Sequence, residues 1–323
     1  MQGEMIRHWG YPMDRHDVET SDGFVLELFR IPHGRKGFIF ADAGFDVFIA
    51  NLRGTPHGKS HKTLKTSERA FWDFSTDEHT HIDLPAIIDK ALAISNQKSL
   101  IYVGHSQGAV IGLSLLSSHA EYNEKVRSFF GWGSVSTIAH ARGAVGAILY
   151  YIQTLKATAQ VYLGLLGPHE FLPNWTTLFA TLGSACVPEH MHDTRMPVYL
   201  SHFLAGTSTK AMIHHVQNSL TRDANGKFDY GFWNAQRYGK NRPPTYNYSN
   251  IDVPVYFYSS PNDNFGPANE TQALISRLRP DVFKEAFEIP SYGHLDFSVA
   301  LDSPEKVFQP MIEIITSKYP GCH

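Results

Sequence analysis

The sequence has few cysteines and no long apolar run, and both absences narrow the class of protein. Only two cysteines, Cys186 and Cys322, occur among the 323 residues. The chain is therefore not a small scaffold held by disulfides, and the sequence does not fix whether the two pair. No stretch approaches 18 uninterrupted apolar residues, so we expect no transmembrane helix. The first residues, MQGEMIRHWGYPMDRHD, also lack the apolar centre of a signal peptide.

An excess of one sign of charge is missing as well. The chain has 28 Lys and Arg against 31 Asp and Glu, which gives a formal net charge of −3. This balance predicts no nucleic-acid partner, and the total charge does not favour an anionic membrane surface. Apolar residues, in contrast, make up 42% of the chain and suffice for a large core. The length suggests one large domain, or a domain that carries an insertion.

Patterns that bind metals or cofactors are also absent. His79 and His81 stand two residues apart at an expected helix start, so they face different ways. The segment EHMH, residues 189–192, contains a glutamate and two histidines, but no further histidine and carboxylate follow at the spacing of metal ligands. The segment GTPHGKS, residues 54–60, has one residue too few between its glycines for a phosphate-binding loop. We predict that the chain uses neither a metal nor a cofactor.

Strands and helices alternate along most of the chain, as the hydrophobic patterns predict. We expect strands at residues 22–32, 45–54, 99–104, 253–260 and 283–290, and helices ending near 44 and covering 83–95, 109–119 and 304–319. The run at 99–104 is apolar almost throughout, which is typical of a strand covered on both faces. The alternation predicts an α/β fold with a mostly parallel sheet and helices on both faces.

The alternation fails between Ser136 and Thr207. This region is rich in aromatic and small apolar residues, including the run at 147–167. We expect a helical cap inserted above the sheet, with an ordinary helical layer as the alternative. The predicted organisation is then a first part of the core at 1–135, a cap or lid at 136–207, and the second part of the core at 208–323.

The stretch LIYVGHSQGAVIGLSLL, residues 100–116, combines a strand pattern, a sharp break and a helix pattern. A Gly-x-Ser-x-Gly sequence between a strand and a helix is typical of a nucleophile elbow. We expect Gly104 and Gly108 to let the strand and the helix approach closely, and Ser106 to stand at the tip. The backbone N–H of Gln107, at the helix N-terminus, would face a developing oxyanion.

A serine nucleophile needs a base, and in this arrangement an acid and then a histidine follow it along the chain. Asp263 comes just after the strand at 253–260, whereas Asp252 precedes that strand at the wrong end of the sheet. His294 comes after the last expected strand, and Asp296 is too close to it to be its partner. The sequence therefore predicts a catalytic triad of Ser106, Asp263 and His294.

Segments that run nearly from end to end of the chain carry a resemblance to a known family. They are IRHWGYP (6–12), DGFVLELFRIPHGRK (22–36), ADAGFDVFIANLRG (41–54), FWDFSTDE (71–78), DLPA (83–86), YVGHSQG (102–108), EFLPN (170–174), AGTS (205–208), PPTYN (243–247) and HLDF (294–297). The chain resembles the acid lipases, the gastric and lysosomal acid lipase group of the α/β-hydrolase fold.

This resemblance implies hydrolysis of lipid esters such as triacylglycerols or cholesteryl esters, without a cofactor and often at acid pH. It implies a secreted or lysosomal location. The family's nucleophile, acid and histidine fall on Ser106, Asp263 and His294.

One part of the family's pattern is missing here. After the segment that ends at Lys36 the family has another strand and a His-Gly-apolar loop, which supplies the second oxyanion N–H. In this chain HGRK continues directly into GFIFADAG. The cap is also shortened around residues 186–197, and the family's cap disulfide lacks a partner. A splice form or a truncated gene model would give this sequence. We expect a gap in the sheet beside the strand that precedes Ser106, with the triad still assembled.

Two functions therefore stay open from the sequence. The first is a lipid ester hydrolase that forms an acyl-enzyme on Ser106. The second is a catalytically impaired, lipase-like protein that binds lipids. The expected partner of either is a lipid ester, with a lipid-droplet or micelle surface as a possible site of action. Acceptor sequences for N-glycans at Asn174, Asn247 and Asn269 favour a secreted glycoprotein.

Overall fold

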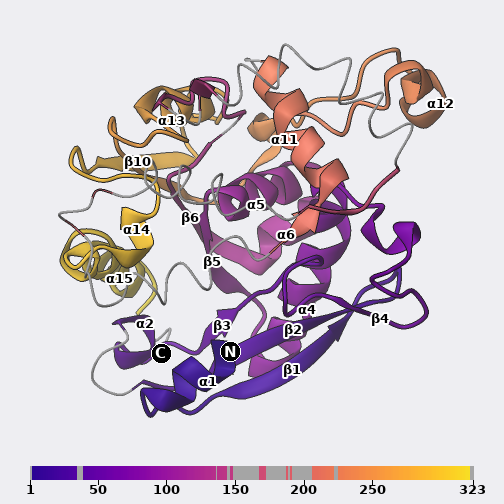
Figure 1. Cartoon of the computed structure of the whole chain (residues 1–323). Coiled ribbons are helices and arrows are strands. Elements are labelled where there is room, and N and C mark those ends of the chain that lie inside the picture. The colour runs from indigo at the N-terminus through magenta and orange to yellow at the C-terminus, as the bar shows by residue number, and fades with distance from the viewer. Residues whose placement is uncertain are drawn as a thin grey trace.

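The described residues form two four-stranded β-sheets that lie side by side with helices packed around them, and a small two-stranded sheet of β7 (Glu170–Phe171) and β8 (Thr207–Ser208) (Figure 1). The computed structural model describes residues 2–34, 39–135, 137–143, 146–147, 167–171, 187, 190, 206–221 and 225–320. One sheet is parallel and has the strand order β10-β9-β6-β5. Its strands are β5 (Leu100–His105), β6 (Val126–Trp132), β9 (Val255–Ser259) and β10 (Phe283–Glu288). This is the α/β-hydrolase architecture that the sequence predicts.

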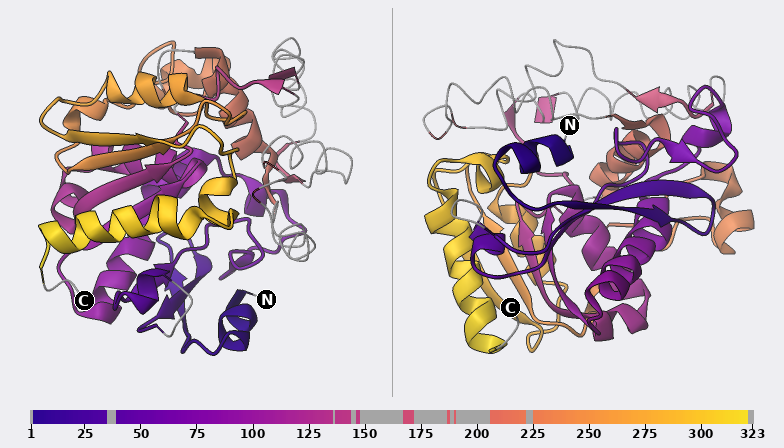
Figure 2. Two further views of the ribbon diagram at one scale, coloured as in Figure 1. Left: turned by 90° about the vertical axis from the view of Figure 1, so that its left-hand side faces the viewer. Right: turned by 90° about the horizontal axis from the view of Figure 1, so that it is seen from below.

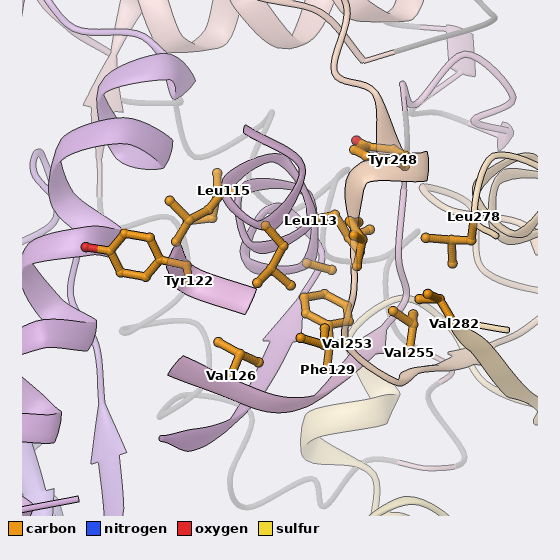
Figure 3. Close-up of a cluster of buried hydrophobic side chains, with 14 of the residues drawn as sticks. Leu113, Leu115, Tyr122, Val126, Phe129, Tyr248, Val253, Val255, Leu278 and Val282 are labelled. Carbon is orange, nitrogen blue, oxygen red and sulfur yellow. The ribbon is translucent and has the colours of Figure 1, made fainter. Parts of the chain in front are cut away.

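Helices cover both faces of the parallel sheet because its central strands are apolar throughout. On one face, α5 (Gln107–Ser118) and α13 (Ala268–Ile275) pack on Phe129, Val255 and Phe257. Figure 3 shows Leu113 and Leu115 of α5 beside the strand residues Val126 and Phe129. Burying an aliphatic or aromatic side chain of this size contributes about 1.5–3 kcal/mol.

The opposite face is covered by the last two helical segments of the chain. These are η7 (Pro304–Phe308) and α15 (Gln309–Lys318), and α15 lies along the strands in Figure 2. Their residues Val307 and Met311 are fully buried with Phe130 and Tyr258 of the sheet. Neighbouring residues of β6 thus point to opposite faces, as the period of a strand requires.

The second sheet is antiparallel and is formed by the N-terminal part of the chain. It consists of β1 (Asp14–Glu19), β2 (Phe24–Ile31), β3 (Val47–Ile49) and β4 (Ser60–His61). The remaining described elements are α1 (Gln2–His8), α2 (Ile39–Asp42), η1 (Arg69–Trp72), α3 (Thr76–Glu78), η2 (His79–Asp83), α4 (Leu84–Ser95), α6 (Ala120–Lys125), β7 (Glu170–Phe171), β8 (Thr207–Ser208), α11 (Thr209–Thr221), η5 (Gly231–Trp233), α12 (Asn234–Tyr238), η6 (Tyr248–Asn250) and α14 (Asp296–Val299).

The expected break in the sheet is present beside the strand that leads to Ser106. β3 pairs with β2, with Ile49 opposite Phe29, and β5 pairs with β6. Within the described residues no strand joins β3 to β5. The prediction that residues 99–104 form a strand covered on both faces is therefore wrong, because Val103 of β5 is 36% exposed. The buried strand predicted around β3 is likewise only half-buried.

The helix α4 and a buried ion-pair network connect the two sheets across this break. Leu84 and Ile88 of α4 belong to the apolar cluster around α5, whereas Ile87 and Ala91 pack against the antiparallel sheet. A helix that buries both sides in this way replaces part of the cohesion that a shared strand would give.

Arg53 is the centre of the ion-pair network and is only 2% exposed. Its Nε donates to Oδ1 of Asp83, at the N-terminus of α4, at 2.8 Å, and its Nη1 donates to Oδ2 of Asp22, between β1 and β2, at 2.6 Å. Its guanidinium also lies 4.1 Å from the ring centre of Phe24. The antiparallel sheet is thus tied to α4 by charged hydrogen bonds shielded from water, which are the strong kind.

A polar substitution at the open edge should therefore cost little. We expect Val103→Thr to change the free energy of unfolding by no more than about 0.5 kcal/mol, because the side chain stays partly in water. Val255→Thr, on the fully buried strand β9, is the matched control. It should cost about 1–3 kcal/mol, because its hydroxyl is buried without a partner. Urea unfolding followed by fluorescence measures both, and equal costs would mean that β5 is covered in solution.

The other predicted elements have mixed outcomes. The strands around β2, β3, β5, β9 and β10 and the helices around α2, α4, α5 and α15 are confirmed, although β3 and β5 are less buried than predicted. The described strands β1, β4, β6, β7 and β8 carry no prediction. Most of the cap predicted at residues 136–207, with Cys186, the 147–167 run and Asn174, lies outside the described residues, as do the 36–37 junction and Cys322. None of the described helices is long and apolar enough to cross a membrane.

Candidate active site

Ser106 stands at a strained turn between β5 and α5. Its backbone has φ 52° and ψ −114°, a conformation that a residue with a side chain rarely adopts. Such positions cost about 1–3 kcal/mol and occur mainly at functional sites. A Cβ atom at Gly104 would lie 2.7 Å from the backbone carbonyl carbon of Gly108, so only glycine fits there. The expectation that Gly108 relieves a similar contact is wrong, because open space surrounds its Cβ position.

The backbone N–H of Gln107 is free at the start of α5. Further along the first turn, the backbone N–H groups of Ala109 and Val110 both donate to the carbonyl of Ser106. Within the described residues the Gln107 N–H has no acceptor, as is usual for the first turn of a helix. It carries the partial positive charge of the helix N-terminus. This geometry suits the oxyanion donor predicted at Gln107.

Asp263 and His294 form a buried pair beyond the ends of β9 and β10. Nδ1 of His294 lies 2.8 Å from Oδ2 of Asp263, whose side chain is fully buried. The other oxygen, Oδ1, accepts the backbone N–H groups of Phe265 and Gly266, both at 2.8 Å. Burial alone would raise the pKa of Asp263, but His294 and these two N–H groups hold it below its usual value. The carboxylate stays ionised and fixes the imidazole in one orientation.

The serine turn and the histidine loop are joined through His105. Its Nε2 donates to the backbone carbonyl of His294 at 2.8 Å, and the two rings lie 4.8 Å apart. Within the described residues no hydrogen bond links the Ser106 hydroxyl to the His294 imidazole directly. Catalytic contacts of this kind often close only when substrate is bound. The structure therefore gathers the three predicted residues at the ends of the strands on one side of the parallel sheet.

Comparisons with known proteins agree with this fold. The chain matches the family model of the alpha/beta hydrolase fold over residues 35–301 and that of a partial alpha/beta-hydrolase lipase region over residues 3–65. It is 32% identical over 369 residues to Lipase lipl-1 of Caenorhabditis elegans, and the match covers 97% of this chain and 90% of that protein. The chain belongs to the α/β-hydrolase lipases.

Two mammalian relatives match over similar lengths. The gastric triacylglycerol lipase of Bos taurus is 30% identical, and the human lysosomal acid lipase/cholesteryl ester hydrolase is 31% identical. In each match 97% of this chain and 90% of the relative are covered. The alignments extend over 365 and 366 positions, more than the 323 residues of this lipase-family chain. The relatives therefore contain internal residues that have no counterpart here, in line with the break in the sheet.

Solved structures support the same fold for the lipase-family chain. A soluble variant of monoglyceride lipase from Saccharomyces cerevisiae superposes with a TM-score of 0.63 at 15% identity, covering 95% of this chain and 94% of that one. The alpha/beta hydrolase GrgF from a Penicillium species gives a TM-score of 0.57 at 14% identity, with 95% and 98% covered. At these identities the likeness concerns the fold alone.

Neither of the two other aspartates near the expected triad reaches the imidazole. Asp252 lies before β9 and binds Arg279 on the surface, at 2.5 Å. Asp296 is fully buried, but its Oδ2 accepts the backbone N–H groups of Gly293 and Val187 rather than His294. The structure thus pairs His294 with the aspartate that strand position favours.

Sequence reasoning missed several residues that shape this site in the lipase. Gly133 follows β6 with φ +47°, and a Cβ there would lie 3.1 Å from Nδ1 of His294. The ring of Phe265 stacks on His294 at 4.7 Å. His105 joins the two loops, as described above. For Gly133 the available signal is its place after a parallel strand, at the edge of the sheet where sites of this fold form.

His79 lies behind the elbow and is held in its neutral form. Its Nδ1 accepts the side-chain amide of Gln107 at 3.0 Å, and its Nε2 faces the backbone carbonyl of Arg53 at 3.4 Å. The ring is 2% exposed. Burial first, and then the charge of Arg53, lower the pKa of His79 to about 3. A proton on Nδ1 would face the amide donor of Gln107, so acid works against this contact.

This histidine should make the folded lipase less stable in acid. In the unfolded chain a histidine has a pKa of about 6.5, so below that pH the unfolded state binds the proton first. The free energy of unfolding is therefore unaffected by this titration above pH 6.5 and falls as the pH decreases from 6.5 towards 3. At pH 5 the fall that His79 alone causes is about 2 kcal/mol. Urea titrations at pH 7 and at pH 5 measure how far the free energy of unfolding falls between the two. For His79→Gln this fall should be smaller than for the parent by about 2 kcal/mol. An equal fall in the two proteins would contradict the role given to His79.

Proposed function

We propose that the chain hydrolyses lipid esters through a triad of Ser106, His294 and Asp263. The observation that carries this proposal is the buried pair of His294 and Asp263, 2.8 Å apart, at the same sheet edge as the strained serine turn. A buried carboxylate is costly unless partners compensate its charge. A buried aspartate paired with a histidine is therefore seldom incidental, and of the three triad residues this pair is the strongest support for the proposal.

Each residue has a defined role in the proposed reaction. The Ser106 hydroxyl attacks the ester carbonyl while Nε2 of His294 takes its proton. Asp263 keeps the other ring nitrogen protonated and stabilises the imidazolium. The Gln107 N–H stabilises the negative oxygen of the tetrahedral intermediate. His294 then gives its proton to the departing alcohol, and an acyl group stays on Ser106. Water, deprotonated by His294, releases the fatty acid in the second half of the cycle.

The names of the relatives support lipid esters as the substrate class. One is a triacylglycerol lipase and another a cholesteryl ester hydrolase, and both are about 30% identical to this chain over almost its full length. We include neutral lipid esters, and a secreted or lysosomal site of action, in the proposal for this reason. Exposed Asn247 and Asn269 are accessible to glycosylation in such a compartment.

Labelling by a fluorophosphonate probe tests the nucleophile independently of the substrate. The probe phosphonylates a serine only when a base activates it, so the intact mass should rise by one adduct that maps to Ser106. Ser106→Ala should abolish the adduct. Ser114→Ala, a buried serine of α5 away from the elbow, is the matched control and should label like the parent. Absence of an adduct on the folded parent would overturn the triad mechanism.

A second function is favoured by one observation, the open edge of β5. With no strand between β3 and β5, the loop that supplies a second oxyanion N–H in related lipases has no place in the described residues. Loss of one such donor costs about 10²–10³-fold in rate. A lipid-binding protein with a weak or silent triad is therefore the alternative. The same labelling experiment separates the two, because a silent triad leaves Ser106 unmodified on a chain that still binds lipid.

A further inference from the structure

Two neighbouring aromatic side chains project from the surface at the turn between Tyr230 and α12. Phe232 is 104% exposed and Trp233 is 67% exposed. Among the described residues only three other large apolar side chains are exposed, and those three lie apart from one another in the sequence. We call Phe232 and Trp233 the aromatic tip. The tip directly precedes α12, which Figure 1 shows at the periphery of the molecule, beyond α11.

The backbone beneath the aromatic tip is held firmly by hydrogen bonds. Asn234 is 2% exposed and its side chain donates to Oδ1 of Asp229 at 2.7 Å, while its own oxygen accepts the N–H of Tyr230 at 2.9 Å. The N–H of Gly231 also bonds to Asp229, at 2.8 Å. Gly231 has φ +62°, a turn conformation that suits glycine. The backbone of the tip is thus held in place, so little backbone freedom is lost when the tip inserts into a partner.

Three cations accompany the aromatic tip. Arg237, Lys240 and Arg242 are all exposed, and no acidic residue occurs between positions 231 and 251. Within the described part of the chain none of the three forms a salt bridge, and Arg237 lies over the ring of Tyr230 at 4.9 Å. The net charge of −3 for the whole chain hides this local excess of positive charge.

We propose that the aromatic tip anchors the protein to a lipid surface that carries anionic headgroups. Trp and Phe beside Arg and Lys form the combination that binds at the boundary between headgroups and acyl chains. A projection that is fully exposed suits a soft lipid layer, whereas a protein partner would have to supply a matching pocket. The anchor would hold the enzyme where its substrates gather, and in this respect it rests on the proposed lipid ester hydrolysis.

Vesicle binding tests the anchor without catalysis. The full chain carrying Ser106→Ala is sedimented with vesicles of phosphatidylcholine alone and with 30% phosphatidylserine added. Adding Phe232→Ser and Trp233→Ser should lower the partition coefficient on the anionic vesicles about tenfold or more. Trp9→Ser removes another exposed tryptophan, 55% exposed and distant in sequence, and should leave binding unchanged.

The charge part of the proposal has its own variant. Replacing Arg237, Lys240 and Arg242 by glutamine should weaken binding to anionic vesicles about fivefold per cation and remove the preference over pure phosphatidylcholine. Circular dichroism and thermal unfolding should match the parent, because all five substituted side chains are exposed. Unchanged binding of the tip variant would overturn the proposal, as would equal binding of the parent to both vesicles or binding to neither.

The result is separable from the fate of the proposed reaction. Fluorophosphonate labelling of Ser106 should be the same with and without the tip substitutions, because the tip does not contribute to the triad. A chain that fails to label but binds anionic vesicles through the tip would refute the hydrolase and retain the anchor. A chain that is labelled at Ser106 but does not bind anionic vesicles would refute the anchor and retain the hydrolase.

Discussion

Replacing Asp263 by asparagine is expected to lower kcat/KM for a short-chain ester about 10⁴-fold while the protein stays folded. The carboxylate accepts Nδ1–H of His294 at 2.8 Å and is itself fixed by the N–H groups of Phe265 and Gly266. An amide that presents NH₂ to the imidazole favours the tautomer with its proton on Nε2, which cannot accept the proton of serine. Steady-state hydrolysis of p-nitrophenyl butyrate, with circular dichroism as a check of folding, measures the effect.

Asp296→Asn is the matched control for this substitution. It is the other fully buried aspartate near His294, and it contacts backbone N–H groups rather than the imidazole. We expect it to lower kcat/KM tenfold at most. A loss at Asp296 as large as that at Asp263 would mean that the loop, and not one hydrogen bond to the imidazole, determines activity.

The Arg53→Met substitution is expected to be the most damaging for stability, at about 3–5 kcal/mol. Arg53 is 2% exposed and binds Asp83 and Asp22 at once, so its loss leaves the fully buried Asp83 charged and unpaired. The broken sheet increases the effect, because these bonds connect the antiparallel sheet to α4. That cost is a large part of the ~5–15 kcal/mol that stabilises an ordinary domain.

Two further variants separate the ion-pair network from the loss of any arginine. Arg30→Met removes a guanidinium that bonds Asp46 at 2.9 Å near the surface, and it should cost about 1 kcal/mol or less. Adding Asp83→Asn to Arg53→Met should recover part of the stability, because the unpaired charge is then gone. Urea unfolding of the parent and these three variants at pH 7 gives the three differences in the free energy of unfolding. A cost at Arg53 no larger than at Arg30 would show that the network does not connect the two halves.

Much of the site follows from the sequence because its signals are local. The Gly-x-Ser-x-Gly turn fixes Ser106 through its own strand and helix patterns, and the places of Asp263 and His294 follow from the rule that parallel strands end at one edge. The break in the sheet was also predictable, since the resemblance showed which strand the chain lacks. Each of these inferences depends on the sequence of a single strand or loop and not on packing between distant segments.

Features that depend on packing between distant segments were not predictable in the same way. Val103 belongs to an apolar run that is typical of a covered strand, yet it is exposed because no strand of the described residues pairs with β5 on that side. Gly108 fits the elbow motif, although no contact requires glycine there. For Phe232 and Trp233 the sequence pattern predicts nothing, and only the fold shows that both side chains are exposed.

The most direct test of the account is turnover of emulsified tributyrin by the purified chain and by its Ser106→Ala variant. We expect continuous release of butyrate by the parent and a rate at least about 10³-fold lower in the variant, because in the proposed mechanism Ser106, His294, Asp263 and the Gln107 N–H carry out acyl transfer despite the break in the sheet. Equal rates for the two proteins, with both shown to be folded, would contradict it.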